Sequence, residues 1–164
     1  MTSPQASTLV SLLANEIHLL NNLCNVLAQE KEILLNRQFE NLESLANQKQ
    51  ELSEQLEASG KQRSELLTSS SNSSEHKNAL EIFLNGCSAE EAGQIKRLNE
   101  ELANKLIHCR ELNTVNGQVI VTNLNIRQEL VQILHGQHPA EAVNTYTSTG
   151  DLNSKAGSNH HEKA

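Results

Sequence analysis

Histidines are the residues of this chain that most readily suggest a metal site. His135 and His138 are three residues apart, and His160 and His161 are adjacent. A zinc site needs further cysteine, histidine or carboxylate ligands at a compatible spacing, and none accompanies either pair. Gly136 also interrupts the helical face that would align the first pair. We therefore interpret these histidines as solvated side chains and predict neither a metal nor any other cofactor.

Cysteines and carboxylates are the other residues able to do chemistry. Cys24, Cys87 and Cys109 are odd in number and far apart, which indicates reduced thiols in a cytosolic protein. Cys24 and Cys109 fall on apolar stripes, where a thiol behaves as a small hydrophobic side chain. Carboxylates such as Glu30 and Glu40 alternate with basic residues, as on a solvated helix surface. The sequence contains no phosphate-binding glycine loop, nucleophile elbow or HExxH motif, so we predict that the protein is not an enzyme.

The spacing of apolar residues predicts a long first helix. Leucines at steps of seven, with Ile17 and Cys24 between them, lie on one face of an α-helix because 3.6 residues make a turn. The stripe predicts a single helix over about 5–67, with Pro4 at its first position and Ser3 as its cap. Two successive steps of four around Gln38 predict a local unwinding of the supercoil. The leucines of this stripe are Leu13, Leu20, Leu27, Leu34, Leu42, Leu45, Leu52 and Leu56.

Two further helices are predicted in the rest of the chain. The serine-rich run at 68–74 predicts a linker, followed by a short helix over about 75–85 that ends at Gly86 in a left-handed cap. Ser88 and Glu91 form a capping-box pattern, which predicts a final helix over about 89–135 with Gly136 as its stop. The final helix carries a second apolar stripe, made of Ile95, Leu98, Leu102, Leu106, Cys109, Leu112, Val115, Val119, Ile126, Leu130 and Ile133.

These elements predict an all-α fold. Aromatic residues make up only 2% of the 164 residues, so leucine and isoleucine must supply most of the apolar burial, as in helical bundles. We expect one domain over 5–136, either an antiparallel hairpin of long helices or a small bundle with coiled-coil character. In it, the first and last helices pair antiparallel and the short helix joins them. The small, polar segment 137–164 predicts a flexible tail.

The charge of the chain excludes several classes of partner. The net charge of −7 disfavours nucleic acid and anionic membrane surfaces. No apolar run approaches the roughly 18 residues that span a bilayer, so we expect no direct membrane insertion. The N-terminus lacks a basic region followed by an apolar stretch, which predicts no signal peptide and a cytoplasmic protein.

The final helix has more apolar surface than one packing seam requires. Val119, Ile120 and Val121 are consecutive, so they cannot all face one neighbour. Leu124 also lies off the main stripe. Either this helix packs between two neighbours, or part of it awaits another protein. The residues leave these two possibilities equally open.

Three segments together resemble a FlgN-type flagellar export chaperone. The first is LLANEIHLLNNLCNVLAQEKEIL, which leads into FENLESLANQKQEL. The second is the pair Asn116–Gly117 in an apolar C-terminal helix. The third is Tyr146, followed four residues later by Gly150. The segments cover most of residues 9–150 in the order of the family. The serine-rich linker and the long polar extension after Gly150 depart from it.

The resemblance implies a cytosolic, non-enzymatic chaperone that uses no ATP. It would bind the hook–filament junction proteins, keep them soluble and deliver them to the cytoplasmic domain of the flagellar export-gate protein. Tyr146 and Gly150 would then dock on the export gate. The rival interpretations are a coiled-coil scaffold or tether without a secreted cargo, and a chaperone for other type III substrates. The cargo-binding residues would lie on the C-terminal helix: Leu112, Val115, Val119, Ile120, Leu124, Ile126, Leu130 and Ile133.

Overall fold

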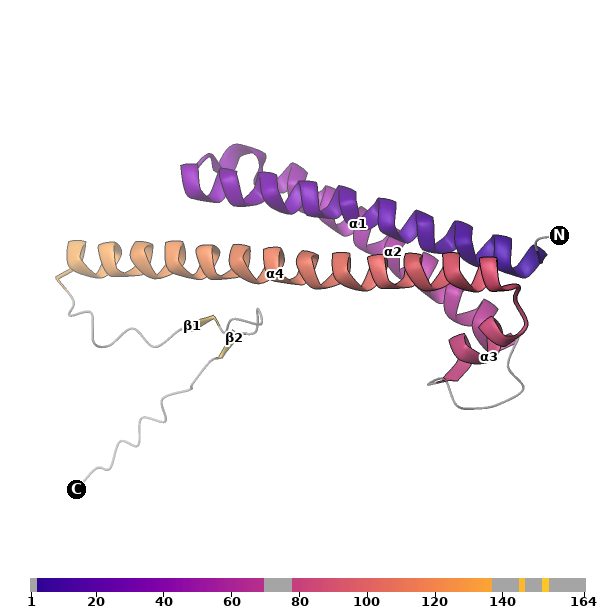
Figure 1. The fold of residues 1–164 in the computed structure, drawn as a ribbon. Helices are drawn as coiled ribbons and strands as arrows, with labels where there is room; N and C mark the ends of the chain where they lie inside the picture. The colour runs from indigo at the N-terminus through magenta and orange to yellow at the C-terminus, as the bar shows by residue number, and fades with distance from the viewer. Residues whose placement is uncertain (1–2, 70–77, 137–144, 147–151, 154–164) are drawn as a thin grey trace, which may run out of the picture.

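The structure, a computed structural model, describes residues 3–69, 78–136, 145–146 and 152–153. Long helices packed side by side make up almost all of it, which confirms the predicted all-α class (Figure 1). Two short strands, β1 (Thr145–Tyr146) and β2 (Leu152–Asn153), pair antiparallel. The helices are α1 (Pro4–Asn36), the 3-10 turn η1 (Phe39–Asn41), α2 (Leu42–Ser69), α3 (Ala79–Asn85) and α4 (Ala89–Leu134).

The predicted single helix over 5–67 is wrong, because the chain reverses after Asn36. Arg37 adopts a left-handed conformation with φ 56°, and its backbone N–H bonds to the carbonyl of Ile33. The N–H of Gln38 bonds to the same carbonyl at 3.0 Å. α2 then folds back along α1 as an antiparallel hairpin (Figure 1). The irregular spacing at Gln38 therefore marks a turn and not an unwound stretch of helix.

α1 and α4 run parallel, so the predicted antiparallel pairing of the first and last helices is wrong. The amide of Asn116 donates to the carbonyl oxygen of Leu27, and that of Asn123 to the carbonyl oxygen of Leu34. A step of seven residues along α1 thus matches a step of seven along α4. The reversal at Arg37 explains the direction, since it adds one more change of course between α1 and α4. α1 contacts α2 and α4 along its length.

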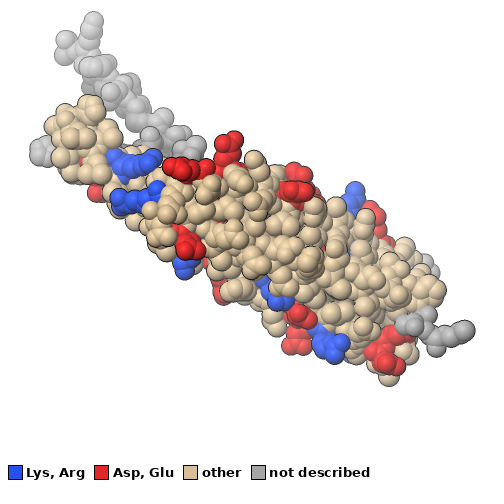
Figure 2. All heavy atoms as spheres, turned by 90° about the horizontal axis from the view of Figure 1, so that it is seen from above, with Lys and Arg blue, Asp and Glu red and all other residues tan. Residues whose placement is uncertain are grey.

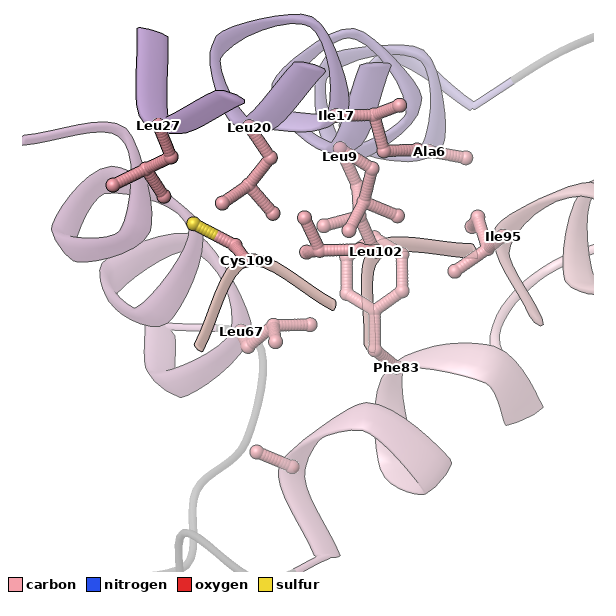
Figure 3. Close-up of a cluster of buried hydrophobic side chains, with 12 residues drawn as sticks. Ala6, Leu9, Ile17, Leu20, Leu27, Leu67, Phe83, Ile95, Leu102 and Cys109 are labelled. Carbon is pink, nitrogen blue, oxygen red and sulfur yellow. The ribbon is translucent and has the colours of Figure 1, made fainter. Parts of the chain in front are cut away.

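The core lies where the two leucine stripes meet (Figure 3). Leu9, Leu13, Leu20 and Leu27 of α1 and Ile95 of α4 are each 2% exposed or less, which confirms that the start of the first predicted stripe is core. The second stripe is core only in part, because its later members are exposed. Phe83 of α3 and Leu67 of α2 close the end of the bundle near the N-terminus of α1. The full cluster consists of Ala6, Leu9, Leu13, Ile17, Leu20, Leu27, Leu67, Ala79, Phe83, Ile95, Leu102 and Cys109.

The observed helix caps agree with the predicted caps at some positions and differ from them at others. Pro4 is the first residue of α1 as predicted, but the Ser3 side chain makes no capping hydrogen bond. The capping box at the start of α4 is confirmed by the reciprocal bonds between Ser88 and Glu91. Gly86 ends α3 with φ −87°, so the predicted left-handed cap is wrong there, whereas Gly136 does have a left-handed φ of 72°.

The short middle helix begins later than expected, at Ala79, and α2 extends to Ser69. The predicted linker at 68–74 therefore overlaps the last turn of α2, and its remaining residues lie outside the described ones. Most of the predicted tail over 137–164 also lies outside them.

Candidate functional site

A buried polar cluster joins three helices in the middle of the molecule. Asn116 of α4 is 1% exposed and donates to the carbonyl oxygen of Leu27 at 2.8 Å and to Glu30 Oε2 at 3.0 Å. Lys49 of α2 contacts both oxygens of Glu30 at 3.1 Å. Glu30 is 7% exposed, so the prediction that it lies on a solvated helix surface is wrong. A buried carboxylate needs such partners, because it has lost the hydrogen bonds of water. The cluster positions the second half of α4 relative to the α1–α2 hairpin.

The last turns of α4 extend beyond this hairpin (Figure 1). The heptad that places Asn116 opposite Leu27 and Asn123 opposite Leu34 brings Leu130 next onto the same seam. α1 has ended at Asn36, so this next position of the seam has no residue of α1 opposite it. At about 1.5 Å per residue, the part of α4 after Asn123 is about 16 Å long. We call residues 126–134 the overhang.

The proposed cargo-binding residues become more exposed along α4. Leu112 and Val119 are half-buried, and Val115, Ile120, Leu124 and Ile126 are 37% to 38% exposed. In the overhang, Leu130 and Ile133 are 55% and 64% exposed. Two further apolar residues of the overhang, Val131 at 53% and Leu134 at 83%, were missed because they lie off the predicted stripe.

A groove lies between the hairpin tip (residues 34–46) and α4. Its volume is about 410 Å³, and its walls are mostly apolar. Arg127 of α4 places its guanidinium 5.2 Å from the ring centroid of Phe39, a cation–π distance. Phe39, Ala46 and Arg127 were missed by sequence reasoning, which placed residues 39–46 inside a continuous helix. The other lining residues are Glu30, Leu34, Leu42, Ile120, Asn123 and Leu124.

This geometry bears on the two possibilities that the sequence left open for the final helix. Before Asn116, α4 buries Ile95, Leu102 and Cys109 in the core cluster. Ile120 and Leu124 line the open groove, although Leu124 lies off the main stripe. From Ile126 onward the apolar side chains are exposed. The second half of α4 therefore carries an apolar surface that no helix among the described residues covers, and cargo binding there stays a prediction.

The backbone of Tyr146 lies in β1, where it pairs with Leu152, and Thr145 pairs with Asn153. β1 contacts α4. The predicted partner of Tyr146, Gly150, lies outside the described residues. The docking role of Tyr146 and Gly150 stays a prediction.

The histidines and cysteines form no metal cluster in the described part of the chain. The ring of His135 has Nδ1 2.7 Å from the carbonyl oxygen of Val131, and His138, His160 and His161 lie outside that part. Burial, and next the neighbouring thiol of Cys24, raise the pKa of Cys109 to about 11. A high pKa suppresses the reactive thiolate, in keeping with the predicted role of Cys109 as a small core residue.

The face of the molecule in Figure 2 shows no single charged patch among the described residues. On the face in Figure 2, acidic and basic side chains lie in small separate groups around uncharged surface. Among the helices that the structure describes, none is long and apolar enough to cross a membrane. The most distinctive surface of the described chain is therefore apolar. It consists of the groove and the overhang of α4.

Comparison with known proteins agrees with this architecture. The profile of the FlgN protein family matches residues 1–154. The chain is also similar to a Pseudomonas aeruginosa protein of known crystal structure described as a flagella synthesis protein, FlgN. The two are 29% identical, with a TM-score of 0.62 over 73% of this chain and 89% of that one. No curated protein matches the chain. The chain therefore belongs to the FlgN family and has a role in flagellar assembly.

Proposed function

We propose that this protein is a cytoplasmic export chaperone that binds hook–filament junction proteins, keeps them soluble and delivers them to the flagellar type III export gate. The observation that carries the proposal is the overhang of α4. Its side chains Leu130, Val131, Ile133 and Leu134 are each more than half exposed. Apolar surface gathered on one segment is typical of a site for another protein.

The seam geometry indicates what kind of partner fits the overhang. Leu130 continues the heptad seam that α1 fills up to Leu34. A second helix lying in line with α1 would pack on this seam in the same way, by setting its apolar side chains between those of α4. Amphipathic terminal helices of exported filament-type subunits have this character.

The apolar area that the overhang can bury limits the binding free energy that it can supply alone. Burying four fully exposed side chains at about 1.5–3 kcal/mol each would contribute about 6–12 kcal/mol before costs, and these four contribute less because they are already partly buried. Lost freedom on association costs about 4–15 kcal/mol, and a micromolar complex needs about 8 kcal/mol net. The overhang by itself is therefore marginal, and the cargo must contact further surface, which the partly exposed Val115, Ile120 and Leu124 supply.

Delivery to the gate is assigned to the segment that contains Tyr146. An aromatic side chain has only two torsions, so it loses little conformational entropy on binding. It also buries a large apolar area, which suits a single anchor in a pocket. A segment that docks through one anchor binds modestly and releases quickly. Those kinetics suit a chaperone that hands over its cargo and returns, and this role needs no catalytic group.

The competing candidate is a scaffold or tether that carries no secreted cargo. In that case a second copy of the chain would cover the overhang. Co-expression with hook–filament junction proteins, followed by size-exclusion chromatography with light scattering, separates the two candidates. A chaperone gives a mixed complex, whereas a scaffold gives a homodimer and no mixed complex.

Two variants locate the binding surface in the same experiment. Leu130→Asp places a charge on the seam and should abolish the mixed complex, while circular dichroism stays helical. Thr114→Asp is the matched control, because Thr114 is exposed on the opposite face of α4 and should leave the complex intact. A mixed complex that survives Leu130→Asp would remove the overhang from the binding surface.

A further inference from the structure

We propose that the groove at the hairpin tip is a second part of the cargo-docking surface. It receives a bulky apolar side chain of the cargo helix that lies on α4, and Arg127 pairs with a carboxylate of the same helix. The inference rests on the proposed chaperone function and extends the docking surface from α4 to Phe39, Leu42 and Ala46 of the hairpin.

The groove is continuous with the overhang. Ile120 and Leu124 line the groove, and Val131 and Leu134 are exposed beyond it. These four residues follow one another at steps of four, seven and three, which places them on one face of α4. A helix that packs on this stripe along the overhang therefore also reaches the groove. The hairpin tip then forms the far wall of its binding site.

The shape and lining of the groove suit side chains of a helix. Its volume of about 410 Å³ is many times the roughly 30 Å³ that one water molecule occupies in the liquid. Leu34, Phe39 and Leu42 form one apolar wall, and Ile120 and Leu124 form the other. Amphipathic helices bind such grooves by inserting anchors at steps of three and four residues.

Charge complementarity indicates the chemistry of the partner. Glu30 is already balanced by Lys49 at 3.1 Å and bonded by Asn116. Arg127 contacts the Phe39 ring, and no ion pair joins it to a carboxylate among the described residues. A cation at the mouth of an apolar groove attracts an acidic group. The cargo helix therefore carries an aspartate or glutamate about one turn from its apolar anchor.

Filling the groove tests this arrangement directly. Ala46 is exposed and lines the groove, so Ala46→Trp obstructs it without disturbing the core. Ala58→Trp is the matched control, because Ala58 is also exposed on α2 but does not line the groove. Calorimetry with a purified hook–filament junction protein should show the dissociation constant rise about tenfold or more for Ala46→Trp, and stay within about twofold for Ala58→Trp.

The charge is tested separately. Arg127→Gln should weaken binding about three- to tenfold and flatten the salt dependence of the affinity, as loss of an interfacial ion pair does. Arg110→Gln, at an exposed position on the same helix, should change neither quantity. An unchanged salt dependence in Arg127→Gln would contradict the predicted acidic partner.

The outcomes of these experiments distinguish failure of the groove proposal from failure of the proposed chaperone function. If the wild-type protein binds, Leu130→Asp abolishes binding and Ala46→Trp binds like wild type, the groove proposal is overturned and the chaperone proposal stands. If no hook–filament junction protein binds wild type, both are overturned. If Ala46→Trp converts a dimer of this chain into a monomer, a second copy occupies the groove and the cargo does not.

Discussion

The side-chain amide of Asn116 on α4 donates a 2.8 Å hydrogen bond to the backbone carbonyl oxygen of Leu27 on α1. Seven residues further along both helices, the amide of Asn123 lies 3.4 Å from the carbonyl oxygen of Leu34. A buried polar residue on a helical seam fixes the register of the helices that it joins. This register decides that Leu130 lies beyond the end of α1, where its side chain is exposed.

Asn116→Ala should destabilise the fold, because it removes both hydrogen bonds of the amide and leaves Glu30 with fewer partners. We expect a loss of about 1–3 kcal/mol in the free energy of unfolding, measured in urea. Asn113→Ala is the control, because Asn113 is exposed on the same helix. Equal stabilities for the two variants would show that the cluster does not contribute.

Leu20→Ala and Leu27→Ala should each lower the free energy of unfolding by about 2–5 kcal/mol, because both leucines are 2% exposed or less and the substitution leaves a cavity. Leu35→Ala provides the comparison, since Leu35 is 59% exposed and should change stability by less than about 0.5 kcal/mol. Thermal or urea unfolding followed by circular dichroism measures all three. A cost below about 0.5 kcal/mol at both core positions would mean that the seam is not the core.

Glu91 should make stability depend on pH. Its carboxylate accepts from the backbone N–H of Ser88 at 2.8 Å and of Ser3 at 2.6 Å, and it thereby joins the N-termini of α4 and α1. These hydrogen bonds, that of Ser88 first, lower the pKa of Glu91 below its usual value of 4.5. Its contribution to stability is therefore present above pH 4.5 and is lost as the pH falls through the lowered pKa.

Glu91→Gln should accordingly be less stable than wild type at pH 7, and the difference should shrink below pH 4.5. Glu90→Gln is the control, because Glu90 lies in the same first turn of α4 and feels the same helix dipole. Urea unfolding across this pH range measures the effect. A difference that stays constant with pH would exclude the carboxylate as its source.

Tyr146→Ala should preserve cargo binding and weaken docking to the export gate, because it removes the anchor but leaves α4 unchanged. Calorimetry of the cargo-loaded complexes against the cytoplasmic domain of the gate protein measures the docking affinity, and secretion should slow in parallel. Tyr146→Phe is the control for the phenol hydroxyl. Equal gate affinity for wild type and Tyr146→Ala would contradict the docking role.

The sequence by itself determined which faces of the helices are apolar and where several helices begin. Heptad spacing identified Leu13, Leu20 and Leu27 as core, because a side chain's position around a helix depends only on its place in the sequence. The Ser88–Glu91 capping box identified the start of α4 for the same reason, since its hydrogen bonds join residues three apart.

Only the tertiary structure decided the reversal at Arg37, the parallel direction of α1 and α4, and the groove. The reversal depends on Arg37 in a left-handed conformation. Glycine is the residue that usually marks such a position in a sequence, so an arginine there gives no sign of a turn. A stripe of leucines fixes an apolar face but neither its partner nor its direction, because burial is non-directional. Phe39 and Arg127, 88 positions apart in the sequence, therefore meet through packing that no local pattern encodes.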